Sequence, residues 1–270
     1  MSENKEIIGL IAGGGKFPLM IAHSVRKQGF RIIAVALQGE TDASLAENVD
    51  RVVWIELGQL GKLISTLKKN GVQKALMAGT ITKHRMFGTI KPDRKGLNLI
   101  SKMEVLHDDG ILRAVADELA REGIDILSST HYVPELLAPP GTLTKRKPTQ
   151  TEDEDITFGW QVAKELGRLD IGQCVVVRNR TVLSLEAMEG TDETVLRGGR
   201  LAREKAVVVK VSKPNQDLRF DIPSVGLETV EVMSRVQASV LAVEAGKTLL
   251  FDKSDMITYA DKVGISVIAR

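Results

Sequence analysis

The sequence predicts an α/β fold with two α/β domains, of which the N-terminal one is a Rossmann-like open parallel sheet. Short apolar runs alternate with helical patterns along the chain, which is typical of sheets covered by helices. The first run, residues 7–12, leads through three glycines and a helical pattern into a second run at residues 31–37. Such a βαβ unit requires a right-handed crossover, and its strands are therefore parallel.

The N-terminal half continues this alternation. Strands are expected at residues 7–12, 31–37, 52–55, 74–77 and 124–127. Helices are expected at residues 17–28, 58–70 and 109–122. Pro18 stands in the first turn of the first helix, where its missing N–H costs nothing, and Gly29 ends that helix.

The C-terminal half shows the same kind of pattern after a change of composition. Prolines interrupt regular structure between residues 133 and 152, so this segment is the predicted linker or hinge between domains at 1–132 and 153–270. Strands are expected at residues 173–177, 182–187, 206–211, 239–243 and 266–268. Helices are expected at residues 153–166, 193–203, 227–237 and 254–263.

Composition narrows the class of protein. The chain has 270 residues and a net charge of +2, so no strong attraction to nucleic acid is expected. Cys174 is the single cysteine; it precedes three valines and is interpreted as a buried small hydrophobe rather than a nucleophile. The first six residues do not resemble a signal peptide, and no apolar run approaches the roughly 20 residues that span a bilayer. A cytoplasmic protein is expected, at most peripheral to a membrane.

A glycine turn follows the first predicted strand. Gly13, Gly14 and Gly15 would let a phosphate approach the backbone at the start of a helix, where free N–H groups point outward. The turn departs from the dinucleotide fingerprint because Pro18 replaces its third glycine. Lys16 is not followed by the Ser or Thr of a P-loop. A tight turn without a ligand is the alternative interpretation.

A second turn follows the strand at residues 74–77. In a parallel sheet, Gly79 and Thr80 would lie at the same carboxyl edge as the triglycine turn, where ligands bind. The basic residues that follow, including His84, are either phosphate contacts or a solvated turn. Asp109 starts a helix, and capping of that helix and contact with substrate are both open.

Carboxylates cluster in two turns of the C-terminal half. Glu189, Thr191 and Asp192 follow a strand and precede a helix, where a simple cap by Thr191 would need only one oxygen. Asp221 lies two residues after Arg219, and alternation with its apolar neighbours suggests that it points toward a cleft. Carboxylates beside basic residues are what a metal-assisted reaction on phosphate requires.

These segments together resemble a known family. The shared motifs are Gly9 to Gly15, Ala78-Gly79, Asp108-Asp109 with Leu112-Arg113, Glu165 to Gln173, Glu186-Ala187, Glu189 to Asp192, Lys213-Pro214, and Arg219 with Asp221, Pro223 and Gly226. In this order they resemble the LpxI type of UDP-2,3-diacylglucosamine pyrophosphatase over nearly the whole chain. The segment from residue 166 to residue 173 and the turn that carries Thr191 are the specific motifs.

The resemblance implies a cytoplasmic step of lipid A biosynthesis, in which water cleaves the diphosphate of UDP-2,3-diacylglucosamine to give UMP and 2,3-diacylglucosamine 1-phosphate. It implies Mg²⁺ or a similar divalent cation, a homodimer, and two α/β domains that close over the substrate. Asp221 is the implied catalytic acid. Asp221 and Asp192 are the expected metal ligands. The residues expected to bind substrate are Gly13, Gly14, Gly15, Gly79, Thr80, Asp109, Glu189, Thr191 and Arg219.

Two other functions stay open at this point. A nicotinamide-dependent oxidoreductase would suit the βαβ start, but the third glycine is missing and only Glu40 follows the second strand. A non-catalytic, two-domain nucleotide sensor would keep the glycine turns without needing clustered carboxylates.

Overall fold

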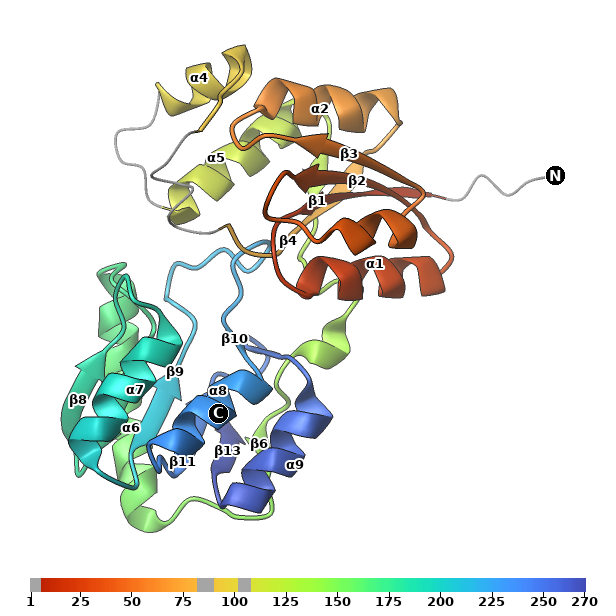
Figure 1. Ribbon diagram of the computed structural model, residues 1–270. Helices are drawn as coiled ribbons and strands as arrows, with labels where there is room; N and C mark the ends of the chain where they lie inside the picture. The colour runs from red at the N-terminus through yellow and green to blue at the C-terminus, as the bar shows by residue number, and fades with distance from the viewer. Residues whose placement is uncertain (1–5, 82–89, 102–107) are drawn as a thin grey trace. The chain divides into compact units, whose positions relative to one another are not determined.

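The computed structural model describes residues 6–81, 90–101 and 108–270 (Figure 1). Its contacts divide the chain into two compact units. The N-terminal unit comprises Met1–Pro134 together with Asp217–Asp221, and the C-terminal unit comprises Glu135–Gln216 and Ile222–Arg270. Each unit has its own sheet, which confirms the predicted fold class of two α/β domains.

The sheet of the N-terminal unit is entirely parallel, as predicted. Its strand order is β3-β2-β1-β4-β5. The strands are β1 (Ile7–Ala12), β2 (Arg31–Leu37), β3 (Arg51–Ile55), β4 (Lys74–Ala78) and β5 (Asp125–Ile126). Since β2 and β4 lie on opposite sides of β1, the order of the strands reverses at β1, and such a switch point is where open α/β sheets bind ligands.

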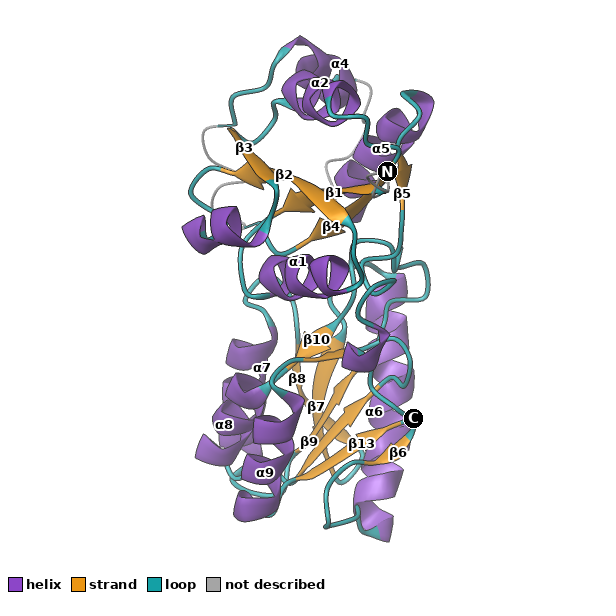
Figure 2. Ribbon diagram, turned by 90° about the vertical axis from the view of Figure 1, so that its right-hand side faces the viewer, coloured by secondary structure: helices purple, strands orange, loops and turns teal. Residues whose placement is uncertain are grey.

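Helices cover both faces of this sheet. They are α1 (Phe17–Lys27), α2 (Leu60–Lys69), α4 (Arg94–Ile100) and α5 (Asp108–Arg121), with a short 3₁₀ helix η1 (Ala43–Asn48). Figure 2 shows α1 on one face and α2 and α5 on the other. Leucines of α2 and Leu119 of α5 pack with Ile33 and Val35 of β2, so β2 is buried between two apolar layers. Pro18 lies in the first turn of α1, as expected.

The sheet of the C-terminal unit is mixed. Its order is β6-β13-β11-β9-β7-β8, in which β13, β11 and β9 are parallel and β7 runs against both β9 and β8. The strands are β6 (Gly141–Thr142), β7 (Cys174–Arg178), β8 (Thr181–Leu185), β9 (Val207–Lys210), β11 (Val240–Val243) and β13 (Ser266–Ala269). A small parallel pair, β10 (Ser224–Val225) and β12 (Leu249–Leu250), stands apart from this sheet.

One helix covers one face of the mixed sheet and three cover the other (Figure 2). The single helix is α6 (Gln150–Arg168), whose first turn carries a capping box between Thr149 and Glu152. The other three are α7 (Thr191–Ala202), α8 (Leu227–Arg235) and α9 (Lys253–Val263). A further 3₁₀ turn, η2, covers Pro134–Leu136. Among the described residues, no helix is both long and apolar enough to cross a bilayer.

The strand directions bring distant parts of the chain to one edge of the mixed sheet. Because β7 runs against both of its neighbours, β8 ends at the same edge as β9, and β7 begins there. Lys210, the last residue of β9, pairs with Cys174, and the carbonyl of Cys174 accepts the N–H of Glu186 at 2.9 Å. This edge therefore aligns Glu186, Cys174 and Lys210 across three strands.

Candidate active site

The two glycine turns of the N-terminal unit interlock at the carboxyl edge of β1 and β4. Gly13 N–H donates to Ala78 O at 2.8 Å, Gly14 N–H donates to Thr80 O at 2.7 Å, and Thr80 N–H donates back to Gly14 O at 3.1 Å. A Cβ on Gly13 would lie 2.6 Å from Thr80 O. Glycine is therefore needed here for the close approach of one turn to the other.

This interlock changes the predicted phosphate cradle. The N–H of Gly13 already donates to the last residue of β4 and that of Gly14 to the turn after it, so they are not free donors for an anion. Gly15 differs, because its φ is +82° and an added Cβ would meet no atom within 4 Å. Gly15 precedes α1, whose N-terminus carries partial positive charge. Of the three glycines, Gly15 is the one that faces open space.

A short segment from the second half of the chain completes the N-terminal unit. In this segment, residues 217–221, the carbonyl of Arg219 accepts Ser129 N–H at 3.0 Å. Phe220 packs against the apolar core beneath α2 and α5. Asp221 N–H donates to Asp217 O at 3.1 Å, so the segment is a tight turn rather than the extended, alternating run expected from the sequence.

Arg219 is held by Asp217 in a bidentate ion pair. Its Nε lies 2.9 Å from Asp217 Oδ1 and its Nη2 lies 2.6 Å from Asp217 Oδ2. The hydrogen bonds from Arg219 lower the pKa of the Asp217 carboxyl, with Arg113 of α5 adding to the effect. The guanidinium also lies over the ring of Phe220, with Cζ 5.5 Å from the ring centre. Two residues, Asp217 and Phe220, thus fix the guanidinium of Arg219, which lies two positions before Asp221.

A hydrogen-bonded network occupies the edge of the C-terminal sheet. Lys210 Nζ donates to Thr191 Oγ1 at 2.9 Å and to Ser224 O at 2.7 Å. Thr191 Oγ1 donates to Glu186 Oε1 at 2.7 Å, and the other oxygen of Glu186 accepts Gln173 N–H at 3.1 Å. Lys210 and Glu186 are each only 8% exposed. A buried charged group whose hydrogen bonds are satisfied in this way is a fixed part of the site.

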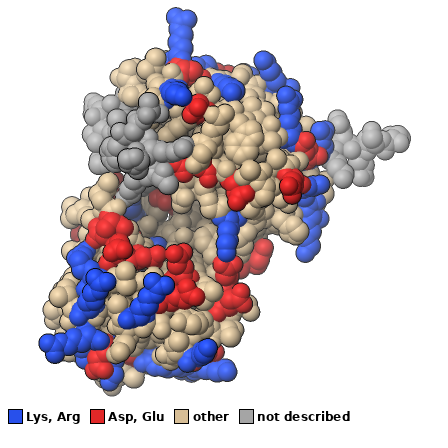
Figure 3. Space-filling view, in the orientation of Figure 1, with Lys and Arg blue, Asp and Glu red and all other residues tan. Residues whose placement is uncertain are grey.

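Asp192 stands beside this network at the start of α7. Burial raises the pKa of its carboxyl, the nearby Glu228, Glu193 and Glu186 raise it further, and Lys210 opposes them. Within the part of the chain that the structure describes, no group donates a hydrogen bond to this carboxylate. Figure 3 shows Asp and Glu side chains gathered on one face of this unit with Lys and Arg beside them. Asp192 thus remains available to bind a cation or a donor.

Glu189 has a partner already. Arg197 of α7 forms an ion pair with it, and Ala187 N–H donates to Glu189 Oε2 at 3.1 Å. The Glu189 backbone N–H and Arg197 together hold the pKa of this carboxyl below its usual range. The helix cap is Gly190, with φ of +84°, and not Thr191. Thr191 instead forms part of α7 and directs its hydroxyl to Glu186.

The predicted site residues thus fall into three groups. Gly13, Gly14, Gly79 and Thr80 are brought together with one another, and Arg219 and Asp221 lie in the turn of residues 217–221 of the same unit. Glu189, Thr191 and Asp192 lie together at the start of α7 in the C-terminal unit. Asp109 lies in α5, but its side chain is outside the described residues, as is the whole of His84.

Two important residues are not among the predicted ones. Lys210 is the single charged residue in the run from Ala206 to Val211, and a lone cation in a buried valine strand is a signal that the sequence does offer. Asp217 lies in the same acidic turn as Asp221, but its pairing with Arg219 depends on the fold of that turn and is not visible in the sequence. Cys174 is buried as expected, and burial raises the pKa of its thiol far above the usual range.

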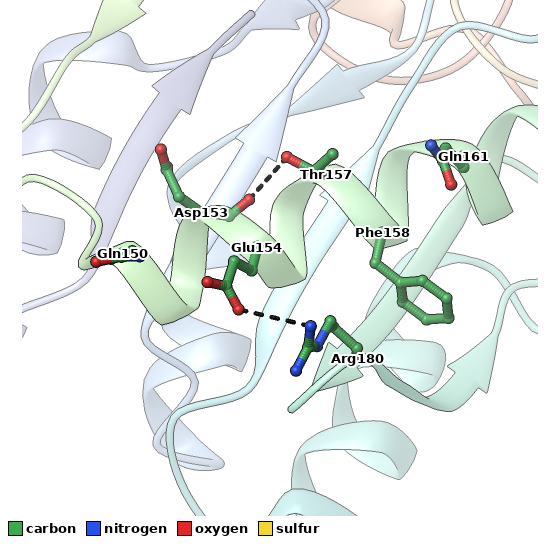
Figure 4. Close-up of a pocket in the computed structure, with 7 residues that line it drawn as sticks. All are labelled: Gln150, Asp153, Glu154, Thr157, Phe158, Gln161 and Arg180. Atoms are coloured by element: carbon green, nitrogen blue, oxygen red, sulfur yellow. Dashed lines mark hydrogen bonds and ion pairs between the residues drawn. The ribbon is translucent and has the colours of Figure 1, made fainter.

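A surface groove lies elsewhere on the C-terminal unit. It measures about 440 Å³ and lies along the outer face of α6, beside Arg180 (Figure 4). Its lining includes Glu154 and Arg180, which form an ion pair at 3.9 Å, and the ring of Phe158. None of the predicted site residues lines this groove, so it is separate from the candidate site.

Comparison with known proteins decides the family. A profile described as the LpxI N-terminal domain matches residues 7–136, and one described as the LpxI C-terminal domain matches residues 139–268. A protein of Caulobacter vibrioides, named UDP-2,3-diacylglucosamine pyrophosphatase LpxI, is 34% identical over 272 residues, which is 97% of this chain and 96% of that protein. The chain belongs to the LpxI family.

Solved structures add little to this LpxI assignment. CobK precorrin-6A reductase matches with 11% identity over 98% of this chain and 87% of its own, at a TM-score of 0.35. N5-carboxyaminoimidazole synthetase from Staphylococcus aureus, complexed with ADP, matches with 13% identity over 65% of this chain and 39% of its own, at a TM-score of 0.26. At these scores neither likeness carries a functional argument.

Proposed function

We propose that this chain hydrolyses the diphosphate of UDP-2,3-diacylglucosamine to UMP and 2,3-diacylglucosamine 1-phosphate (lipid X) in lipid A biosynthesis. The observation that carries the proposal is the 34% identity, over 97% of the chain, to a protein named for this activity. The two LpxI domain matches support it independently. In the reaction, water supplies an oxygen to one phosphorus, and the bond from that phosphorus to the bridging oxygen breaks.

The donor set of the chain suits magnesium. Among the described residues, no three His, Cys, Asp or Glu side chains lie together as a ready metal site. Mg²⁺ does not require such a cage, because it keeps several waters and is usually held by one or two carboxylates with substrate phosphates. Asp221 and Asp192 are the proposed ligands. When bound, the cation would neutralise charge on the diphosphate and help to activate water.

The side chains of the chain have distinct proposed roles. Asp221 is the proposed catalytic carboxylate. Arg219, already oriented by Asp217, is the proposed fork for phosphate oxygens. The backbone N–H of Gly15, at the start of α1, is the proposed donor, and Thr80 lies next to it through its hydrogen bonds to Gly14. Three further residues are proposed to contact the substrate: Asp109, Gly79 and Glu189.

The alternative functions lack a supporting observation. A dinucleotide-binding turn presents backbone N–H groups to the pyrophosphate, whereas the N–H groups of Gly13 and Gly14 donate to the end of β4 and to the turn after it. A nucleotide sensor would not need the buried network around Lys210 and Glu186. These features favour the hydrolase over both alternatives.

One assay separates the three functions. Purified protein is incubated with UDP-2,3-diacylglucosamine and Mg²⁺, and UMP is measured, with and without a chelator. Metal-dependent release of UMP is expected. Binding of UDP-sugar without release would support the sensor. A change in nicotinamide absorbance with no UMP would support the oxidoreductase.

Two further properties belong to the proposal. We expect a homodimer, which light scattering on the purified protein would detect. We also expect peripheral contact with the inner membrane, because the proposed substrate carries two acyl chains; co-sedimentation with vesicles of inner-membrane composition would test it.

A further inference from the structure

Lys210 is the most deeply placed cation of the candidate site. It ends the buried strand β9 and is 8% exposed, and burial of an ammonium is costly unless its donors are satisfied. Its two short contacts go to Thr191 Oγ1 and to Ser224 O, and neither acceptor is a carboxylate. The ammonium group of Lys210 is therefore stabilised by hydrogen bonds to a hydroxyl and a carbonyl oxygen rather than by an ion pair.

These contacts tie three segments together. Lys210 belongs to β9, Thr191 is the first residue of α7, and Ser224 begins β10. The cap of α7, Gly190, supplies no side-chain hydrogen bond that would fix the start of the helix. The hydrogen bond from Lys210 holds the side chain of Thr191 at this helix start. Asp192 follows Thr191 directly.

The contacts also decide what the Thr191 hydroxyl is able to do. A hydroxyl has one proton to donate and two lone pairs to accept with. An ammonium only donates and a carboxylate only accepts, so the proton of Thr191 points to Glu186 and one lone pair is taken by Lys210. One lone pair remains, and Thr191 can therefore serve a ligand only as an acceptor.

We infer that Lys210 is a positioning residue of the candidate site: it orients the Thr191 hydroxyl so that this oxygen accepts from a ligand donor, and it fixes the start of α7. The inference rests on the proposed hydrolysis. The ligand group at Thr191 is therefore a hydrogen-bond donor, that is, a hydroxyl, an N–H or a metal-bound water, and ionised phosphate oxygens are excluded because they only accept.

Lys164 provides a matched control. It is a second lysine with short, partly buried contacts in the same unit, donating to Glu244 Oε2 at 2.6 Å and to Ser212 O at 2.8 Å. Its partners follow β9 and β11, but they do not include Thr191 or Asp192. A lysine that only stabilises the fold should behave as Lys164 does.

The test is a double-mutant cycle on turnover. Lys210→Met and Thr191→Val are made singly and together, and kcat and KM are measured for the release of UMP, corrected for the folded fraction. If Lys210 acts through Thr191, Lys210→Met lowers kcat by about 100-fold with KM changed less than about threefold, and the double variant is no more than about threefold below the worse single variant. Lys164→Met should change kcat less than about threefold, and its effect should multiply with that of Thr191→Val.

The outcomes separate the inference from the proposed function. Two results would overturn the inference without contradicting the proposed function. One is that the effects of Lys210→Met and Thr191→Val on kcat multiply. The other is that a folded Lys210→Met variant has a kcat within about threefold of that of the unsubstituted protein. Absence of UMP release from the unsubstituted protein would overturn both. If Lys210→Met does not fold, Lys210→Gln retains a donor without the charge, and the same cycle with Thr191→Val decides.

Discussion

Alanine substitutions at Gly13, Gly15 and Gly79 separate the two physical reasons for glycine at the carboxyl edge of β1 and β4. Gly15 has φ of +82° and open space around an added Cβ, so Gly15→Ala should cost only the left-handed backbone, about 1 kcal/mol. Gly13 does not have positive φ, but its Cβ would lie 2.6 Å from Thr80 O. Forcing the two turns apart should cost about 1–3 kcal/mol.

Gly79→Ala combines both effects. Its φ is +93°, and an added Cβ would lie 2.5 Å from Gly14 O. Backbone strain and overpacking together should cost about 2–5 kcal/mol. The expected order of destabilisation is therefore Gly79→Ala first, then Gly13→Ala, then Gly15→Ala.

Urea unfolding followed by tryptophan fluorescence measures these costs. The two tryptophans are Trp54 in β3 and Trp160 in α6, so a Trp160→Phe background makes the signal report the N-terminal unit alone. The same variants separate folding from function, because Gly15→Ala should raise KM for the UDP-sugar while folded Gly13→Ala should leave KM unchanged. A Gly13→Ala variant no less stable than Gly15→Ala would refute the interlock, and an unchanged KM in Gly15→Ala would refute the backbone-donor role.

Three further predictions concern the ion pairs and the cation. Asp217→Ala frees the guanidinium of Arg219 and should raise KM about tenfold with less effect on kcat, and an unchanged KM would contradict the role of Arg219. Burial raises the pKa of Glu244, but Lys164, Lys247 and a backbone N–H outweigh it, so the pKa lies below its usual value. The ionised Glu244 therefore stabilises the fold above its unfolded pKa, near 4.5, and this stabilisation is lost as the pH falls. In Glu244→Gln, the free energy of unfolding should decline less steeply between about pH 5 and pH 3 than in the unsubstituted protein. Equal slopes in the two proteins would contradict this. Chelation of divalent cations should abolish release of UMP, and added Mg²⁺ should restore it. Full activity in the presence of chelator would show that the reaction needs no divalent cation.

The sequence predicts the strands of the N-terminal unit closely. The expected strands at residues 7–12 and 31–37 have the bounds of β1 and β2, because continuous apolar runs end there at glycine or at polar residues. Helix α4 was not expected. It spans seven residues, begins at Asp93 as its cap and buries only Gly96, so it has no apolar stripe to reveal it.

Strand direction and long-range contacts are beyond what periodicity predicts. The valine runs of β7 and β9 look alike in sequence, yet one runs against the other in the mixed sheet. The two-residue strands β10 and β12 are too short to show any period.

The sequence predicts the individual turns of the candidate site, but not the contacts between residues that are far apart in the chain. The turns that carry Thr191 and Asp221 stand out by composition. The contact between Ser128 and Leu218 joins residues 90 positions apart, so the sequence does not reveal that residues 217–221 belong with the N-terminal unit. For the same reason, the sequence does not show that Lys210 reaches Thr191.

The central claim is that the carboxylate of Asp221 is required for hydrolysis of the UDP-sugar. The most direct measurement compares release of UMP by the unsubstituted protein and by Asp221→Asn, which keeps the shape of the side chain and removes its charge, with substrate binding measured in parallel. The proposal predicts that turnover falls by about 1,000-fold or more while binding stays within about tenfold. Turnover within about threefold of the unsubstituted protein would contradict it.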